Sequence, residues 1–354
     1  MTEPRSTSDF DSIFADDDAD FREPREPRRP RRKRTGRKIL VGAVVLVLLA
    51  VLGIGGYAFY LANQFDRGTE DVSDDEAFGG ERPETSGAGT NILLLGSDSR
   101  DEEVDLADAR GNRSDTIMVM HIPEDRSGVQ LMSIPRDIWV DIEGHGEAKI
   151  NAAMSFGGLA LATSTVSDFI GAPIHHVAII DFEGFQALTD SLGGVDVVSE
   201  QAFELDGHAF QEGVNHLDGE QALAFVRARK NFADGDLQRN RNQQAFLAGV
   251  MDELISRDTL SNPTRIAGIV RDFSPYMTVD SGLDSRRIGS LAYQLRDVRQ
   301  DDIVFFSAPI GGLGTSSDGQ SYLSVDEAEL EEVRSAFADD TVGAYAAQAE
   351  TQHL

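Results

Sequence analysis

Short apolar runs alternate with amphipathic segments along the chain beyond residue 90. Six of these runs have the length of strands, and several are apolar throughout, as in strands covered on both faces. They are "NILLLGSD" (91–98), "TIMVMHI" (116–122), "VQLMSI" (129–134), "VAIIDF" (177–182), "VDVV" (195–198) and "IVFF" (303–306). Helical periodicity lies between them, in residues 151–170, 182–192, 218–226, 236–256, 284–297 and 325–338. This alternation predicts one α/β domain over residues 91–338, with a central sheet covered by helices, and a short tail at 339–354.

The first 90 residues follow another pattern. Residues 1–21 are acidic and without apolar period, which is typical of disorder, and residues 22–38 hold ten basic residues. Residues 39–61 then run for 23 residues without a charge. At ~1.5 Å per residue such a helix reaches roughly 35 Å, enough to cross a bilayer core of ~30 Å. Residues 62–90, with eight acidic residues and a Gly- and Pro-containing end, predict a flexible acidic linker.

The position of the basic block sets the expected topology. Because positive residues stay on the cytoplasmic side, residues 1–38 are expected inside and residues 62–354 outside. The apolar stretch ends in "YAFYLANQF", which lacks a convincing cleavage site, so an uncleaved signal anchor is favoured over a cleaved signal peptide. The basic block also makes anionic membrane lipid an expected partner, with a DNA-binding tail as a weaker alternative. The prediction is a single-pass protein of the cell membrane.

Composition removes several classes of function. A formal net charge of -29 argues against a general nucleic-acid binder, which needs a basic surface. The chain has no cysteine, which excludes disulfides, zinc–thiolate sites and thiol catalysis. Its seven histidines show no HExxH-like spacing, which argues against a histidine zinc site.

A group of arginines stands out in "FVRARKNFADGDLQRNRNQQ", residues 225–244. In the predicted helix 236–256, Arg239, Gln243 and Phe246 recur at three- and four-residue steps, and the later turns of this face are apolar. An apolar face packs on the core, so Arg239 and Gln243 should point inward as well. A buried guanidinium without an anion costs several kcal/mol. The pattern therefore predicts a socket for an anionic ligand, with a solvated charge run as the alternative.

Arg227 and Arg229 end the preceding predicted helix. They lie on one side only if the chain is extended there. For Lys230 and Arg241 a solvated position is favoured.

Charged residues also stand at the ends of the apolar strands. Asp98 follows the first strand, Arg113 and Asp115 come directly before the second, and Arg136 and Asp137 follow the third. Sites in open α/β sheets lie at strand ends. Turn and capping roles are the alternative for any single acid. Three such clusters at three successive strand ends favour a shared site.

The two groups together have a definite chemistry. Arginines bind phosphate oxygens in bidentate fashion. Paired carboxylates hold Mg²⁺, which prefers oxygen ligands and bridges phosphates. This combination suits phosphoryl transfer, where positioning and charge neutralisation do most of the catalysis.

These motifs, in their order, resemble the LytR–CpsA–Psr family. The resemblance covers about residues 90–325 and rests on "NILLLGSDSR", "RSDTIMVMHI", "SIPRDIWV", "KINAA", "DFEGFQALTDSLGGVDV", "LDGEQALAFVRARK", "GDLQRNRNQQ" and "DGQSYL". It implies a membrane-bound ligase that moves a cell-wall glycopolymer from a polyprenyl-pyrophosphate carrier to the 6-hydroxyl of N-acetylmuramic acid in peptidoglycan, forming a phosphodiester. It also implies an α/β fold with a hydrophobic pocket for the prenyl tail.

The resemblance assigns roles by motif position. Asp98 and Asp115 would hold Mg²⁺ or Mn²⁺, and Asp236 would be a further acid at the same site. The expected pyrophosphate ligands are Arg113, Arg136, Arg227, Arg229, Arg239 and Gln243.

Some points depart from the family pattern or stay open. Many members carry an arginine where this chain has Asn242, so no role passes to Asn242 or to Arg241. The arginine-rich tail suggests an actinobacterial source and arabinogalactan as one candidate cargo. Two rival functions remain: a pyrophosphatase that uses the same site, with water as acceptor, and a membrane-anchored regulatory protein that acts through its cytoplasmic tail.

Overall fold

The computed structural model describes residues 35–352, apart from residues 85–88, 98–113, 230 and 233–234. Some of these residues are described by their backbone alone: residues 35–51, Ser97, Ser114, Asp115, Asp236 and the last few of the chain. The chain divides into two compact units, Met1–Gly55 and Gly56–Leu354. The second unit contains every element except the first part of helix α1 (Thr35–Gly68).

The predicted membrane anchor falls largely outside the described residues. Most of the expected cytoplasmic tail (1–38) is not described, and the expected span (39–61) is described with its side chains only from Leu52 onward. In the part of the chain that is described, no helix has both the length and the apolar character needed to cross a membrane.

A seven-stranded sheet forms the centre of the second unit. Its order is β1 (Glu70–Val72), β12 (Met277–Asp280), β7 (His176–Asp181), β2 (Thr90–Ser97), β3 (Ser114–Ile122), β4 (Val129–Ile134) and β13 (Ile303–Ser307). The pairs β1–β12, β7–β2 and β4–β13 are parallel, while β12–β7, β2–β3 and β3–β4 are antiparallel. The predicted central sheet is confirmed, and five of the six predicted strands belong to it.

The sixth predicted strand lies elsewhere. Residues 195–198 fall in β8 (Val195–Ser199), which pairs with β11 (Gly213–Leu217) in a separate two-stranded sheet. Its burial alternates from residue to residue, because this small sheet packs on α6 with one face only. Three further two-stranded sheets are β5 (Trp139–Ile142) with β6 (Gly146–Lys149), β9 (Phe203–Leu205) with β10 (His208–Phe210), and β14 (Ile310–Thr315) with β15 (Ser321–Val325).

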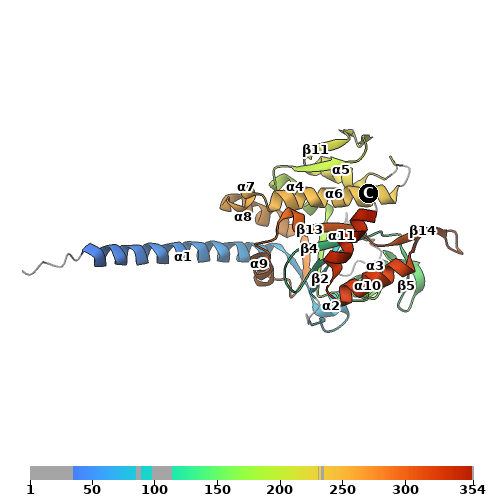
Figure 1. Ribbon diagram of the computed structural model, residues 1–354, viewed down its shortest axis with the longest axis horizontal. Coiled ribbons are helices and arrows are strands. Elements are labelled where there is room, and N and C mark those ends of the chain that lie inside the picture. The colour runs from blue at the N-terminus through green and yellow to red at the C-terminus, as the bar shows by residue number, and fades with distance from the viewer. Residues whose placement is uncertain (1–34, 85–88, 98–113, 230, 233–234, 353–354) are drawn as a thin grey trace, which may run out of the picture. The chain divides into compact units, whose positions relative to one another are not determined.

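Helices cover both faces of the central sheet, as the sequence predicts (Figure 1). On one face, Leu93, Val119 and Met132 pack into a core shared with α3 (Ala152–Ile170) and α10 (Glu327–Ala338). On the other face, Ile92 and Leu131 pack with α9 (Ser285–Gln294). Helices α4 (Phe182–Ser191), α5 (Gly219–Arg227) and α6 (Asp236–Leu254) build an adjoining core with β8 and β11, and α7 (Arg257–Leu260) and α8 (Pro263–Phe273) follow α6.

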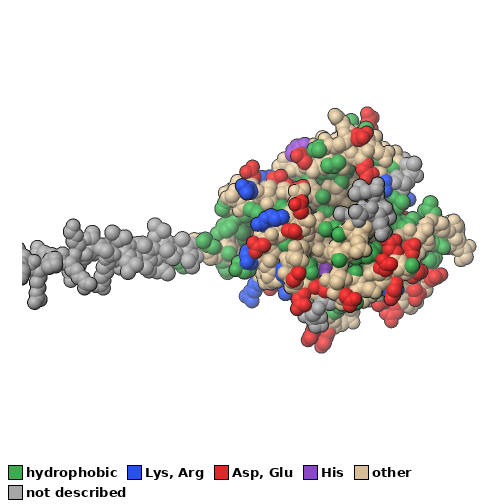
Figure 2. Space-filling model, viewed as in Figure 1, with side chains coloured by type: hydrophobic (Ala, Val, Ile, Leu, Met, Phe, Trp, Pro, Cys, Tyr) green, Lys and Arg blue, Asp and Glu red, His purple; other side chains and the backbone are tan. Residues whose placement is uncertain are grey.

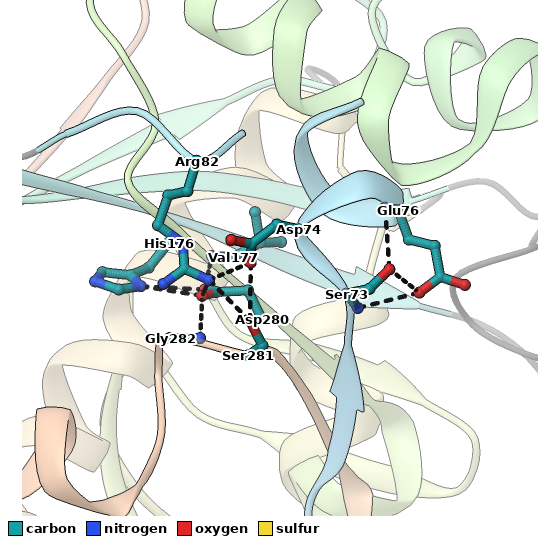
Figure 3. A network of polar contacts seen from close by, with 9 residues as sticks. All are labelled: Ser73, Asp74, Glu76, Arg82, His176, Val177, Asp280, Ser281 and Gly282. Carbon is teal, nitrogen blue, oxygen red and sulfur yellow. Dashed lines mark hydrogen bonds and ion pairs between the residues drawn. The ribbon is translucent and has the colours of Figure 1, made fainter. Parts of the chain in front are cut away.

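The predicted flexible linker, residues 62–90, is wrong for most of its length. Helix α1 continues to Gly68, β1 adds an edge strand to the central sheet, and α2 (Asp74–Phe78) packs on α3. Ser73 and Glu76 form a capping box at the start of α2 (Figure 3). The segment is polar because an edge strand and a short capped helix bury few side chains, of which Val72 and Ala77 are two.

The predicted tail, residues 339–354, also contains folded structure. Helix α11 (Val342–Gln352) packs against β13 and α10, and its Val342 and Ala346 are buried in the main core. The alternation of small apolar residues in "VGAYAAQ" is too weak a pattern to have predicted this helix. The folded unit therefore extends past both boundaries that the sequence suggested.

Candidate active site

Three strand ends meet at one edge of the central sheet. Ser97, the last residue of β2, is opposite Asp181 of β7 and Ser114 of β3. The β2–β3 register shifts between Gly96 and Ser97, so that Asp115 lies at the irregularity. At Gly96 a Cβ would come within 2.9 Å of Thr116 Cβ, so the two strands approach closely there. The backbone thus brings the ends of three strands to one point.

This register also locates the residues that flank the strands. Ile134, which ends β4, is opposite Ile117 of β3, so Arg136 follows two residues later at the level of Asp115. Asp98 comes directly after Ser97 in the chain. The prediction that successive strand ends share one edge is confirmed for the backbone. Asp98 and Arg113 themselves lie outside the described residues, and Asp115 is described without its side chain.

Helix α6 presents the polar face that its sequence predicts. Arg239 and Gln243 are only 7% and 8% exposed, and Phe246, on the next turn, is 1% exposed. The helix begins at Asp236, after Gly235 with φ of 48°, a conformation that favours glycine. Asp236 is described by its backbone, one turn before Arg239. The first two turns of α6 are therefore buried although they are polar.

A pocket of about 200 Å³ lies between the sheet and helices α4, α5 and α6. Its walls are mostly apolar, and its polar groups include Thr116, Asp181, Arg227, Arg239 and Gln243. The apolar lining consists of Leu94, Leu95, Met118, Ile180, Phe182, Phe185, Val226, Phe246 and Leu247. Within it, the rings of Phe185 and Phe246 stack with centroids 4.1 Å apart.

Arg227 is positioned by the chain that follows α5. The helix begins with a capping box between Asp218 and Gln221, as predicted, and ends at Arg227. Ala228 is extended, with φ of −60° and ψ of 119°. The Arg227 guanidinium carbon lies 3.9 Å from the centroid of the Phe182 ring, a cation–π contact. Arg227 therefore reaches the pocket wall.

Asp181 is the other charged group of the pocket. Its carboxylate accepts a hydrogen bond from the Gly184 N–H, 2.7 Å away, and caps helix α4. Burial raises the pKa of Asp181 above its ordinary value, although the Gly184 N–H acts in the opposite direction. A carboxylate near two buried or half-buried cations is thus part of this site.

Only some of the predicted arginines line the pocket. Arg227 and Arg239 line the pocket together with Gln243. Arg136 is half-buried, with its Nε 3.7 Å from the Asp137 carboxylate. Arg229 is exposed and does not line the pocket, because its side chain lies two residues beyond the end of α5. Arg241 pairs with Glu200 at 3.0 Å and keeps 39% of its side chain exposed, away from the pocket, as its position on the helix predicts.

The pocket residues that were not predicted as site residues include Asp181, Phe182 and Thr116. Asp181 ends β7 and Phe182 begins α4, both within "VAIIDF", and Thr116 begins the apolar run of β3. The rule that singled out the charged residues at strand ends, such as Asp98, applies equally to Asp181, so the sequence did contain a signal for it. Phe182 and Thr116 have no such signal, because an aromatic or hydroxyl residue at a strand end fits core packing equally well.

Carboxylate oxygens are the metal donors that the sequence predicts at this edge. Among the residues whose side chains are described, no group of three or more His, Asp or Glu side chains could hold a metal ion. The two predicted ligands, Asp98 and Asp115, are not among those side chains.

The chain belongs to the LytR_cpsA_psr family, whose profile matches residues 59–339. The resemblance predicted from the motifs is therefore confirmed. Its relative in Enterococcus faecalis, named polyisoprenyl-teichoic acid–peptidoglycan teichoic acid transferase TagU, is 33% identical over 307 residues, which cover 84% of this chain and 94% of the relative. The protein of the same name in Bacillus cereus is 34% identical over 253 residues, 69% of this chain and 81% of the relative.

Solved structures have the same fold. The crystal structure of B. subtilis TagV superposes with a TM-score of 0.61 at 28% identity, covering 71% of this chain and 96% of TagV. A structure of TagT bound to LI-WTA superposes with a TM-score of 0.56 at 26% identity, covering 74% of this chain and 94% of TagT.

Proposed function

We propose that this protein is a phosphotransferase that moves a cell-wall glycopolymer from a polyprenyl-pyrophosphate carrier onto the N-acetylmuramic acid 6-hydroxyl of peptidoglycan. The curated relatives, named as transferases to peptidoglycan, support the reaction class. The observation that carries the proposal is the position of Arg239 and Gln243. They occupy the buried face of α6 at a pocket whose other walls are mostly apolar.

A polyprenyl pyrophosphate has the two parts that this pocket suits. Its hydrocarbon tail is stabilised by apolar walls such as Leu94, Met118 and Phe246. Its pyrophosphate is an anion for Arg227 and Arg239, which donate charge-assisted hydrogen bonds, and for the Gln243 amide. The negative charge of the pyrophosphate is complementary to the positive charges of Arg227 and Arg239.

With the pyrophosphate bound at Arg227, Arg239 and Gln243, the proposed transfer proceeds in one displacement at phosphorus. The acceptor hydroxyl attacks the phosphorus that bears the glycan, a new P–O bond forms, and the bond to the prenyl phosphate breaks. The leaving prenyl phosphate gains negative charge, which Arg227 and Arg239 stabilise. The hydroxyl proton needs an acceptor at the same edge. Two carboxyl groups are candidates for this role: Asp181, which lines the pocket, and Asp236, which begins the helix that carries Arg239.

Mg²⁺ or Mn²⁺ is a proposed cofactor. Asp98 and Asp115 are hard oxygen donors of the kind that Mg²⁺ prefers. Asp115 lies at the β2–β3 irregularity, and Asp98 follows Ser97 in the sequence, which supports a magnesium site at this strand edge. The ion would neutralise charge on the diphosphate when bound.

The proposal includes a membrane location. Residues 39–61 would anchor the chain, residues 1–38 would stay in the cytoplasm, and the folded unit would act outside on a lipid-linked substrate. The uncharged 23-residue stretch behind ten basic residues supports this arrangement.

The test is transfer by the purified full chain. It is supplied with a radiolabelled polyprenyl-pyrophosphate-linked glycan and peptidoglycan, and we expect label bound covalently to the peptidoglycan. Release of labelled glycan phosphate without attachment would identify a pyrophosphatase instead. Deleting residues 1–34 should leave transfer intact, whereas a regulatory protein acting through its tail would lose its effect.

A further inference from the structure

We propose that Trp139 and Tyr322 form a platform on which a pyranose ring of the glycan substrate stacks, beside the pyrophosphate site. The inference rests on the proposed function and adds a glycan-binding subsite to it. The two rings come from different hairpins, β5–β6 and β14–β15. They stack with centroids 4.6 Å apart and an interplanar angle of 27°.

The hairpin β5–β6 turns Trp139 away from the core. Ile138 and Ile142 are fully buried, and Val140 packs on the same core cluster. Side chains alternate along a strand, so Trp139 and the exposed Asp141 lie on the opposite face. Trp139 is therefore half-buried at the surface, not a core residue.

The second hairpin supplies the other ring. Tyr322 is opposite Gly314 in the β14–β15 register, and a Cβ at Gly314 would lie 2.4 Å from Tyr322 Cζ. Glycine there lets the Tyr322 ring lie over the neighbouring strand. Its successor, Leu323, is buried in the core, so Tyr322 faces the surface.

Of the other three stacked aromatic pairs of the described residues, two have a ring in the interior, and the third, His145–Phe156, is exposed. In the Phe185–Phe246 and Phe203–Phe210 pairs one ring is buried, at 1% for Phe246 and 3% for Phe210. Neither Trp139 nor Tyr322 is buried. Trp139 and Tyr322 each keep part of their surface exposed, which distinguishes this pair from the two interior pairs.

Backbone contacts join this pair to the segment that follows β4 and carries Arg136. Trp139 follows Arg136 by three residues, in the segment that leaves β4 at the site edge. The Leu323 N–H donates to the Asp137 carbonyl at 2.9 Å, and Ile138 and Leu323 form a β-bridge. The Asp137 carboxylate is paired with Lys149 of β6 at 2.8 Å. Both hairpins are thus fixed to the chain that carries Arg136.

Pyranose rings suit such a platform. Their axial C–H groups form a weakly positive, apolar face, and an aromatic ring presents a negative face. The substrate of the proposed reaction carries sugars immediately beyond its diphosphate, and its acceptor is also a glycan chain. The sugar could come from the donor or from the acceptor, and the experiment separates the two.

Trp139 is the single tryptophan of the chain, so its fluorescence reports on the platform alone. The full chain in detergent is titrated with three probes: farnesyl pyrophosphate, farnesyl-pyrophosphoryl-N-acetylglucosamine, and a soluble peptidoglycan tetrasaccharide. An emission shift with the pyrophosphate-linked sugar but not with farnesyl pyrophosphate places the donor sugar on Trp139. A shift with the tetrasaccharide places the acceptor there. No difference between the sugar probes and farnesyl pyrophosphate overturns the proposal.

Kinetics give a second, independent measurement. Trp139→Leu and Tyr322→Leu should each raise KM for one glycan substrate by roughly 3- to 10-fold with little change in kcat, while Trp139→Phe should retain most of the affinity. Tyr293→Leu is the matched control, because Tyr293 is 70% exposed on α9 and stacks with Arg296 instead of a second ring. Unchanged KM in folded Leu variants overturns the platform. If the parent protein transfers no glycan, the proposed function fails, and the fluorescence titration still tests the platform.

Discussion

Arg239 lies on the face of α6 whose later turns carry apolar side chains. The sequence alone could place it, because three- and four-residue spacing put it in line with Phe246, which is buried. The sequence did not show whether Arg227 and Arg229 contact a ligand or other groups of the protein. That depends on which way two residues turn after α5 ends, and only Arg227 turns to the pocket.

Arg239→Ala should weaken substrate binding or turnover by about 10- to 150-fold, since it removes charge-assisted hydrogen bonds worth ~1.5–3 kcal/mol. Arg239→Lys keeps the charge without the planar fork and should impair less. Because the socket interpretation gives Arg239 a role in binding and not in folding, the alanine variant should unfold at the same or a slightly higher temperature than the parent. Glycan transfer and thermal unfolding are measured side by side.

Arg241→Ala is the control for that experiment. It lies two positions away on the same helix, and its partner is Glu200 at the surface. We expect near-parental transfer. The socket interpretation fails if Arg239→Ala unfolds several degrees lower and yet transfers normally when folded, because the arginine would then be a structural ion-pair partner.

Asp181 should give a pH dependence of stability opposite to that of an ion-paired carboxylate. Burial holds its pKa above the ordinary value. With a raised folded-state pKa, the stabilisation is present below the unfolded pKa and is lost as the pH rises through the folded pKa. Asp181→Asn keeps a capping oxygen and removes the buried charge. Thermal unfolding is measured between about pH 4 and pH 8. The unfolding temperature of the variant should rise relative to that of the parent as the pH rises.

Asp218→Asn is the matched control, because Asp218 caps α5 in the same way but is exposed. A stability difference for Asp181→Asn that does not vary with pH would contradict the argument.

Asp115→Asn tests the proposed metal site. Replacing a carboxylate by an amide removes a charged oxygen ligand, so Mn²⁺ affinity should fall by at least about tenfold while the fold is kept. Mn²⁺ binding is measured by its paramagnetic resonance signal, apart from any activity assay. Asp141→Asn, on the exposed face of β5, should bind Mn²⁺ like the parent. Equal Mn²⁺ binding by the Asp115 variant, or full transfer in the presence of a chelator, would count against the metal site.

Among the helices and strands, the alternating pattern predicted the central sheet and α3 to α6. It did not predict the edge strand β1 of that sheet. Strand β1 has three residues, "EDV", and only Val72 is buried. Nothing in so short a polar segment distinguishes an edge strand from a linker. What fixes it is distant in sequence: β12, which it pairs with, lies about two hundred residues later.

A buried ion-pair network joins this edge to the rest of the sheet (Figure 3). Asp280, at the end of β12, has no exposed side-chain surface and lies 2.6 Å from Arg82. Its carboxylate also accepts the Val177 N–H at 2.7 Å and the Gly282 N–H at 2.9 Å, and contacts His176 at 3.2 Å. Burial alone would raise the pKa of Asp280, but these partners together lower it below its ordinary value.

Arg82→Ala should therefore destabilise the protein by roughly 3 kcal/mol, because it leaves a buried carboxylate without its cation. Because the folded-state pKa of Asp280 is lowered, its stabilisation is present above the unfolded pKa and is lost as the pH falls through the folded pKa. The difference in unfolding free energy between Arg82→Ala and the parent should therefore become smaller in acid. Chemical denaturation at several pH values measures both effects. A flexible linker at residues 62–90 would instead predict no change for Arg82→Ala.

Arg271→Ala is the control, since its pair with Asp272 is exposed and should contribute little. If both variants lose the same stability, the network around Asp280 has no special role.

At the scale of the whole molecule, the charge is uneven. Residues 257–299 hold seven arginines and five acidic residues, whereas residues 300–354 hold one arginine and eleven acidic residues. In Figure 2 the visible Lys and Arg side chains lie mainly on one side of the folded unit, where Asp and Glu side chains are interspersed among them, and Asp and Glu predominate over the rest of the visible face. The Tyr57 hydroxyl donates to the Pro263 carbonyl at 2.6 Å, so α8 begins beside the last turns of the proposed anchor.

The proposed anchor makes a prediction about the whole chain. A periplasmic-type reporter that is active only outside the membrane, fused after Leu354, should be active, because the ten basic residues at 22–38 hold the amino-terminal end in the cytoplasm. A reporter active only in the cytoplasm, fused at the same place, should be inactive. Replacing those ten residues by serine should reduce the outside signal, since orientation then loses its charge bias. A stably expressed fusion that is active only in the cytoplasm would mean that the folded unit lies on that side of the membrane, away from peptidoglycan. This result would contradict the proposed transfer.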